Sequence, residues 1–240
     1  MNKLRAIILA AGASLRMLPL TKEIPKCLLS IGGKTILEYQ LDLLRENGIS
    51  DIVIVNGFAS QKVEEIGKKG ITYIYNKKYL STNSIYSLYL AKDYMDTPLV
   101  LLNSDIIIDR QLMKLLIRTP FPNAILVDFA KELLNGEMNV IVNKGFVTKI
   151  GNDIPARIAD GESVQICKFA KASAKVLRNE IARLINNKNS DKFPAYAFKS
   201  VIAGNGIKAV DTKGNRWIEI DTLDDYRQAC LNFREIINKR

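Results

Sequence analysis

The sequence predicts an α/β protein in which helices flank a mixed, mainly parallel sheet. The chain has 240 residues, of which 48% are hydrophobic and 25% charged, a usual balance for a globular domain with a sizeable core. In the first half, short runs of β-branched residues and leucine alternate with amphipathic segments. This βαβα alternation is typical of a Rossmann-like arrangement, in which ligands bind beyond the carboxyl ends of the strands.

The first half supplies the parallel part of the predicted sheet. The clearest helix covers 35–47, because Leu37, Leu41 and Leu44 share one face and Gly48 follows as a C-terminal signal. Further helices are expected over 60–69 and 84–94. The strands are expected over 6–9, 51–55, 71–75 and 98–102.

The second half adds a small β-rich portion. Two strands, 138–142 and 146–150, flank Asn143-Lys144-Gly145, which is a hairpin signal. Other strands are expected over 163–169, 206–211 and 217–220, and helices over 172–186 and 223–237. We find no internal repeat, so a single domain over residues 1–240 is predicted.

The segment between the first strand and Lys26 predicts a polyphosphate site. The apolar run ending at Leu9 is followed by small residues, namely Ala10, Ala11, Gly12, Ala13 and Ser14. A loop poor in side chains lets backbone N–H groups approach phosphate oxygens, and Arg16 and Lys26 can add positive charge there. The alternative is a tightly packed turn with solvated basic residues.

This segment resembles the signature loop of the nucleotidyltransferases that make nucleoside-diphosphate sugars and alcohols. The resemblance lies in AAG at 10–12, Arg16, Pro19-Leu20-Thr21 and Pro25-Lys26, whereas Ser14 stands where the family usually has glycine. It implies a glycosyltransferase-A-like fold with a nucleotide-binding half (1–128) and an acceptor-binding half (129–240). It also implies that residues 9–14 and Ser104 bind the nucleotide and that Arg16 and Lys26 are catalytic.

Three carboxylates form a candidate metal site. Asp105 follows an apolar strand, and alternation along 217–221 places Glu219 and Asp221 on one face. Two carboxylates pointing the same way repel each other unless a cation lies between them. The positions match those where the family holds Mg²⁺. The alternative is a salt-bridged edge strand beside Lys213 and Arg216.

A second resemblance concerns recognition of the base. Thr82-Asn83-Ser84 lies in a segment, 76–89, that resembles the base-recognition region of the bacterial cytidylyltransferases that include phosphocholine cytidylyltransferases. The amide of Asn83 can pair with the carbonyl and amino edge of a pyrimidine, and Ser84 accompanies it. Simple capping of the following helix is the alternative, since all three residues are good N-caps.

The acceptor side is expected around Glu162 and Gln165. These residues are polar where a pocket for a quaternary amine would favour aromatic side chains. The expected acceptor is therefore a compact phosphate or phosphonate that carries an amine or amide, with phosphocholine kept as one candidate. Solvent-facing strand residues would look the same.

Composition excludes several other classes of function. The chain has no histidine, which removes histidine-based triads and imidazole metal sites, and its three cysteines form no zinc or disulfide pattern. The net charge of +10 is scattered, so no nucleic-acid partner is expected. No apolar run reaches the ~20 residues of a membrane span. A cytoplasmic location and no membrane partner are therefore expected, and an oligomer remains possible.

Together these features predict a Mg²⁺-dependent cytidylyltransferase. CTP would donate its cytidylyl group to a small phosphorylated or phosphonate acceptor, with release of pyrophosphate. An acceptor phosphate is largely anionic at neutral pH, so the reaction needs no general base, in keeping with a chain without histidine. The alternatives are a sugar-1-phosphate nucleotidyltransferase that uses UTP or dTTP, and a non-catalytic nucleotide-binding relative.

Overall fold

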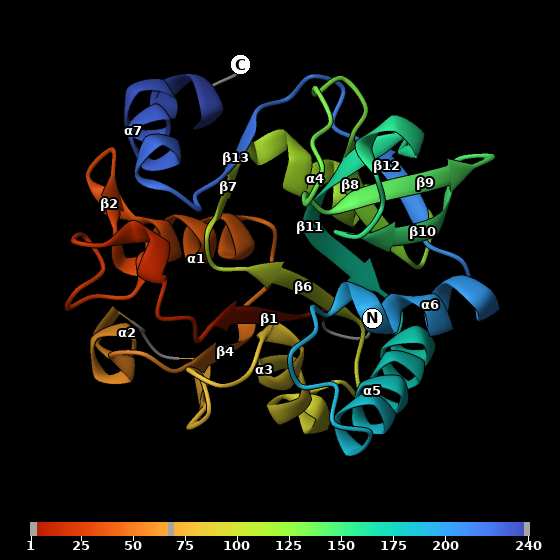
Figure 1. Ribbon diagram of the computed structural model, residues 1–240, viewed down its shortest axis with the longest axis horizontal. Coiled ribbons are helices and arrows are strands. Elements are labelled where there is room, and N and C mark those ends of the chain that lie inside the picture. The colour runs from red at the N-terminus through yellow and green to blue at the C-terminus, as the bar shows by residue number, and fades with distance from the viewer. Residues whose placement is uncertain (1–3, 67–69, 238–240) are drawn as a thin grey trace.

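The computed structural model describes residues 4–66 and 70–237 of the chain (Figure 1). The helices are α1 (Ile36–Glu46), α2 (Ser60–Ile66), α3 (Ser84–Leu90), α4 (Arg110–Arg118), α5 (Lys171–Asn186), α6 (Ala195–Gly204) and α7 (Leu223–Ile237). The strands are β1 (Arg5–Ala10), β2 (Ser30–Ile31), β3 (Lys34–Thr35), β4 (Asp51–Asn56), β5 (Ile71–Tyr75), β6 (Leu99–Asn103), β7 (Ile106–Ile108), β8 (Ala124–Asp128), β9 (Asn139–Asn143), β10 (Phe146–Gly151), β11 (Gly161–Phe169), β12 (Lys208–Asp211) and β13 (Trp217–Glu219).

The central sheet is mixed, as the sequence predicts. Its strand order is β5-β4-β1-β6-β11-β8-β12-β10-β9. The first four strands are parallel, whereas β11 runs antiparallel to both β6 and β8. The carboxyl ends of β1 and β6 therefore lie side by side, and the loop after β1 meets the segment after β6 at one edge of the sheet.

Helices cover both faces of this sheet. One apolar core packs α1, α4 and α7 against the sheet, and the other packs α3, α5 and α6 against its opposite face. Figure 1 shows α3 and α5 below β1 and β6, with α1, α4 and α7 above them. Strand β1 is buried between the two layers, which explains its continuous apolar run. Within residues 4–66 and 70–237, every helix is too short or too polar to span a lipid bilayer.

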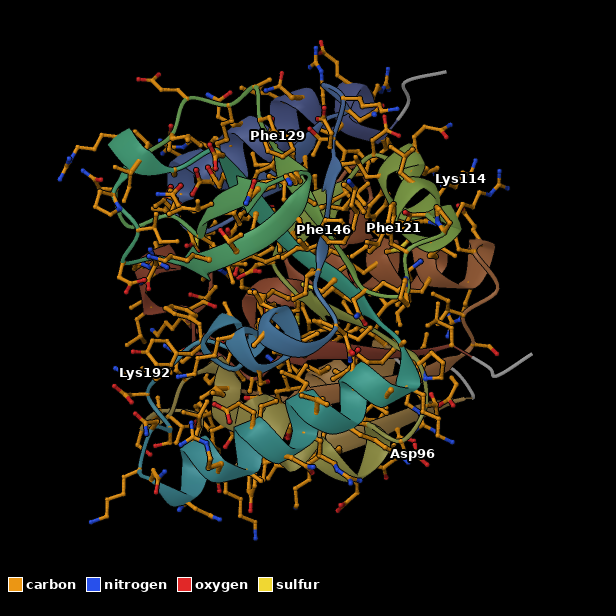
Figure 2. All side chains as sticks on the ribbon, turned by 90° about the vertical axis from the view of Figure 1, so that its right-hand side faces the viewer. Asp96, Lys114, Phe121, Phe129, Phe146 and Lys192 are labelled. Carbon is orange, nitrogen blue, oxygen red and sulfur yellow. The ribbon has the colours of Figure 1, made fainter. Side chains whose placement is uncertain are left out.

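The β-rich second half folds back on itself. The predicted hairpin forms as β9 and β10, and β9 also pairs with β11 through Gly161 and Val140. Phe146 on β10 packs edge-on against Phe121, with 5.6 Å between the ring centroids (Figure 2). The Lys208 ammonium lies 5.0 Å from the centroid of each ring. These contacts pack the hairpin against the segment before β8 and against β12, its neighbour in the sheet.

Helix α1 fixes the segment that follows β6. A reciprocal cap between Thr35 and Glu38 starts the helix, and Gln40 then lies buried on its inner face. The Gln40 amide donates hydrogen bonds of 2.8 Å to the backbone carbonyls of Asn103 and Ile106. Because these two residues bracket Asp105, the position of that carboxylate depends on α1.

Some element bounds differ from the predictions. The helix predicted over 84–94 ends at Leu90, and a 3₁₀ turn covers Lys92–Tyr94. Strand β13 ends at Glu219 rather than at residue 220, and the predicted end of α2 at 67–69 lies outside the described residues. Helices α4 and α6 and strands β2, β3, β7 and β8 were not predicted from the sequence. Strand β7 has only three residues, which is too short for periodicity to predict a strand.

The close approach of Gly57 to the loop after β1 predicts a sensitive position. A Cβ atom at residue 57 would lie 2.5 Å from the Ala11 carbonyl oxygen and 2.8 Å from the Tyr79 Cβ. We expect Gly57→Ala to cost about 1–3 kcal/mol of unfolding free energy and to weaken CTP binding, because the loop must shift. Gly204→Ala, which meets no atom within 4 Å, is the control. Unchanged thermal unfolding and CTP affinity in Gly57→Ala would contradict the expectation.

Candidate active site

A cavity of about 310 Å³ lies beyond the carboxyl ends of β1 and β6. It is bordered by the loop after β1, the start of α3, the segment after β6, the end of β13 and parts of the second half. The lining residues are Leu9, Ala10, Ala11, Gly12, Ser14, Arg16, Pro25, Lys26, Cys27, Asn76, Tyr79, Thr82, Asn83, Ser84, Ser87, Asn103, Ser104, Asp105, Gly136, Glu137, Met138, Asn152, Gln165, Phe193, Glu219 and Asp221. Nearly all the predicted site residues therefore meet in one place.

The loop after β1 turns sharply at Ser14. This residue has φ 50°, ψ 49°, the left-handed conformation that favours glycine over residues with a Cβ atom. The Ser14 carbonyl accepts hydrogen bonds from Met17 N and Thr21 Oγ1, both 2.9 Å. The small residues before this turn line the cavity, except Ala13, which lies outside the lining.

Lys26 lies at the floor of the cavity between two carboxylates. Pro25 is extended and starts a short 3₁₀ turn, which directs the Lys26 side chain inward. Its Nζ lies 2.8 Å from Asp105 Oδ2 and 2.7 Å from Asp221 Oδ1. Burial alone would lower the pKa of Lys26, but the two carboxylates outweigh it and raise the pKa, so the ammonium form is stabilised.

Arg16 reaches the same acidic group from the rim. Its guanidinium Nη2 lies 2.8 Å from Asp221 Oδ2, although the side chain is 71% exposed. Burial raises the pKa of Asp221, but the charges of Lys26 and Arg16 lower it by more than burial raises it. The pKa of Asp221 therefore lies below its ordinary value. The two basic residues predicted from the sequence thus converge on one carboxylate.

Asp105, Glu219 and Asp221 form a compact acidic cluster. One carboxylate oxygen from each residue lies within 4.8 Å of the other two. The short pairing of β13 with β7 brings them together, because Ile220 N donates to the Asp105 carbonyl at 3.0 Å. Asp105 Oδ1 is buried and finds no hydrogen-bond partner among the residues that the structure describes. Clustered hard oxygen donors with an unsatisfied buried oxygen fit a divalent cation such as Mg²⁺.

Glu219 is strongly perturbed by this setting. Burial first, and then the charges of Asp105 and Asp221, raise its pKa to about 8. The Gln165 side chain donates a hydrogen bond to Glu219 Oε2 at 2.8 Å. The charge of Lys26 lowers this pKa but does not cancel the rise, so at neutral pH the metal-free cluster favours a protonated Glu219.

The predicted base-recognition residues cap a helix and border the cavity as well. Asn83 Oδ1 accepts from Ser84 N at 2.7 Å, as an N-cap of α3 does, and Asn83 N donates to the Ser190 carbonyl at 2.8 Å. Asn76, which the sequence analysis did not single out, lies behind them and donates to Ser87 Oγ at 3.1 Å. The segment is thus held rigidly at the cavity wall.

Glu162, which the sequence places on the acceptor side, does not line the cavity. It is buried, its side chain lies outside the cavity lining, and its Oε1 pairs with Lys131 Nζ at 2.9 Å. Lys131 lies 4.5 Å from the centroid of the Trp217 ring. Residues 162 and 165 are three apart, so a regular strand would place them on opposite faces. The expected acceptor contact of Glu162 therefore does not fit this placement, whereas Gln165 does line the cavity.

The second half of the chain lines the cavity mostly with residues that the sequence did not reveal. Gly136, Glu137 and Met138 precede β9, while Asn152 and Phe193 come from loops. Loop residues carry no periodic signal, which explains why they were missed. Cys27 also borders the cavity, but burial raises its pKa to about 12, which keeps the thiol protonated.

A family model described as the MobA-like NTP transferase domain matches residues 6–134. The chain belongs to this family. The match contains the loop after β1, the start of α3 and Asp105, so the first half of the cavity is the part that the family model covers.

Two full-length relatives extend this NTP transferase match to the second half. A CTP:phosphoglutamine cytidylyltransferase from Campylobacter jejuni is 30% identical over 250 residues, covering 92% of this chain and 97% of the relative. A choline-phosphate cytidylyltransferase from Streptococcus pneumoniae is 29% identical over 234 residues, covering 94% and 96%. A solved CTP:phosphocholine cytidylyltransferase from Streptococcus pneumoniae has a TM-score of 0.82 with 24% identity, covering 96% of this chain and 99% of that one, which shows the shared fold.

The raised pKa of Glu219 predicts a pH-dependent stability. A carboxyl group whose pKa rises on folding stabilises the protein below its ordinary pKa, and this contribution is lost as pH rises through about 8. We expect Glu219→Gln to raise the melting temperature of the metal-free protein above about pH 8 and to change it little near pH 5. Thermal unfolding across this range checks it, with exposed Glu65→Gln as control. A wild-type pH profile in Glu219→Gln would contradict the assignment.

Proposed function

We propose that this protein transfers a cytidylyl group from CTP to a small phosphorylated or phosphonate acceptor and releases pyrophosphate. The observation that carries the proposal is the convergence of Lys26, Arg16 and three carboxylates beside the small-residue loop of an NTP transferase. The full-length relatives in the comparison, which are cytidylyltransferases, favour CTP.

The first half would hold the nucleotide. Residues 9–12 and Ser14 border the cavity where backbone N–H groups can meet phosphates, and Ser104 borders the same space. Asn83 and Ser84 lie where an amide and a hydroxyl can read a pyrimidine edge. This supports residues 1–128 as the nucleotide-binding half. Glu219 and Asp221 of the second half also line the same cavity.

The chemistry follows from charge and position. An acceptor phosphate oxygen attacks the α-phosphorus of CTP, a new P–O bond forms, and the bond to the β-phosphate breaks as pyrophosphate leaves. Lys26 and Arg16 would neutralise the phosphates, Lys as a point charge and Arg as a planar fork. Asp105 and Asp221, with Glu219, would hold Mg²⁺, which when bound offsets negative charge on the phosphates. The protein therefore acts through positioning and electrostatics.

The acceptor half presents a carboxylate, an amide and an aromatic ring. Glu137 is half-buried, and Asn152 and Phe193 border the same side of the cavity. A carboxylate and an aromatic face suit an ammonium group, and an amide suits a carbonyl or amide. This supports a compact acceptor that bears an amine or amide. Sugar-phosphate enzymes share the fold at lower identity, for example a UDP-glucose pyrophosphorylase at 17%.

A substrate panel tests the proposal directly. Purified protein with Mg²⁺ is incubated with each NTP and with phosphocholine, an amide-bearing phosphate, aminoethylphosphonate and glucose-1-phosphate, and pyrophosphate is measured. We expect the highest kcat/KM for CTP with an amine- or amide-bearing acceptor. Asp105→Asn should lower kcat by orders of magnitude while the fold persists. A preference for glucose-1-phosphate with UTP or dTTP would contradict the proposal, as would near-normal turnover in Asp105→Asn.

The acceptor contact predicts a selective effect at Glu137. Replacing this carboxylate by an amide removes a charged hydrogen-bond partner, so Glu137→Gln should raise KM for an ammonium-bearing acceptor about tenfold or more. KM for CTP should change little. Exposed Glu132→Gln, outside the cavity lining, is the matched control. A raised KM for CTP with an unaltered acceptor KM would show that Glu137 faces the nucleotide instead.

A further inference from the structure

Strand β11 is interrupted by a β-bulge at the edge of the cavity. Its pairing with β8 shifts register between Ser163 and Cys167. Within this shift Gln165 has φ 58°, a left-handed conformation that few side chains adopt. Its backbone N–H donates to the Ser163 hydroxyl at 2.9 Å instead of to a neighbouring strand. Bulges of this kind re-aim a side chain.

At the bulge, two hydrogen bonds fix the orientation of the Gln165 amide. Its carbonyl oxygen accepts from Asn103 Nδ2 at 3.0 Å, and its nitrogen donates to Glu219 Oε2 at 2.8 Å. Because a primary amide accepts only through oxygen and donates only through nitrogen, the bond from Asn103 sets which end faces Glu219. The backbone carbonyl of Asn103 accepts a hydrogen bond from Gln40 on α1, so α1 helps to fix the position of Asn103.

Gln165 has apolar surroundings on its other side. It borders a second, smaller cavity lined by Leu101, Ile125 and Phe198, among others. The lining of this cavity is mainly apolar, so the polar partners that would draw the amide away from Glu219 are few there. The side chain is therefore held toward the acidic cluster.

We propose that Gln165 is a positioning residue that orients Glu219 within the metal-binding cluster, rather than a residue that binds the acceptor. The amide donates to Glu219 Oε2, and one oxygen of the same carboxylate lies within 4.8 Å of one oxygen each of Asp105 and Asp221, so this hydrogen bond restricts how the carboxylate faces the cluster. Residues that hydrogen-bond to a metal ligand fix its orientation and raise metal affinity. This inference rests on the metal site of the proposed function.

The test measures Mn²⁺ binding apart from turnover. Water-proton relaxation reports the enhancement that the protein adds to Mn²⁺ and CTP in the absence of acceptor. Gln165→Met keeps the size and the backbone strain of the residue but lacks the amide, whereas Gln165→Gly accepts the positive φ and lacks the whole side chain. Both variants should bind Mn²⁺ about 10- to 100-fold more weakly. The Mg²⁺ concentration for half-maximal activity should rise equally, with KM for the acceptor little changed.

The controls separate this inference from the metal site itself. Lys144→Gly relieves a positive φ of 49° in the β9–β10 turn and should leave Mn²⁺ binding unchanged. Wild-type Mn²⁺ affinity in Gln165→Met or Gln165→Gly, above all with a raised KM for the acceptor, would overturn the positioning role alone. A wild-type protein that adds no relaxation enhancement would overturn the metal site and, with it, this inference.

Discussion

The architecture of the cavity depends on keeping three carboxyl groups within 4.8 Å of one another. Asp105 comes from the middle of the chain, whereas Glu219 and Asp221 come from near its end. The short β7–β13 sheet brings them together, and Lys26 compensates two of them with one ammonium. Such a cluster opposes folding unless cations accompany it, so the loop that bears Lys26 and the strand that bears Glu219 stabilise each other.

In the proposed function, the charge balance of this cluster would link the nucleotide to the metal. With Glu219 protonated, two carboxylates face two cations, Lys26 and Arg16, and the charges of the group balance. Phosphates bound at these cations would leave the carboxylates uncompensated and so strengthen their affinity for a divalent cation. A divalent cation at the carboxylates would in turn free the basic side chains for phosphate. Each ligand would then favour the other, because their binding sites share the same counter-ions.

The sequence predicted the parts of this site that follow strands. Asp105, the loop after β1 and the Glu219–Asp221 pair all lie where an apolar run ends, so a local pattern located them. It did not locate Glu137 or Phe193, which reach the cavity from loops without periodicity. It grouped Glu162 with Gln165, although residues three apart on a strand face opposite sides of the sheet. Helix α6 and strand β8 were missed because short apolar runs do not distinguish helix from strand.

Strand β11 shows why the bulge matters beyond one side chain. The strand pairs with β6 and β8 of the first half and with β9 of the second, so it joins the two parts of the sheet. In a regular strand, the residues between Ser163 and Cys167 would remain in the ladder and alternate between the two cores. The register shift instead releases Gln165 toward Asn103 and Glu219. The strain of a left-handed glutamine persists because partners on three different elements define it. The second half, which itself carries Glu219 and Asp221, thus also contacts the acidic cluster through the strand that joins the two parts of the sheet.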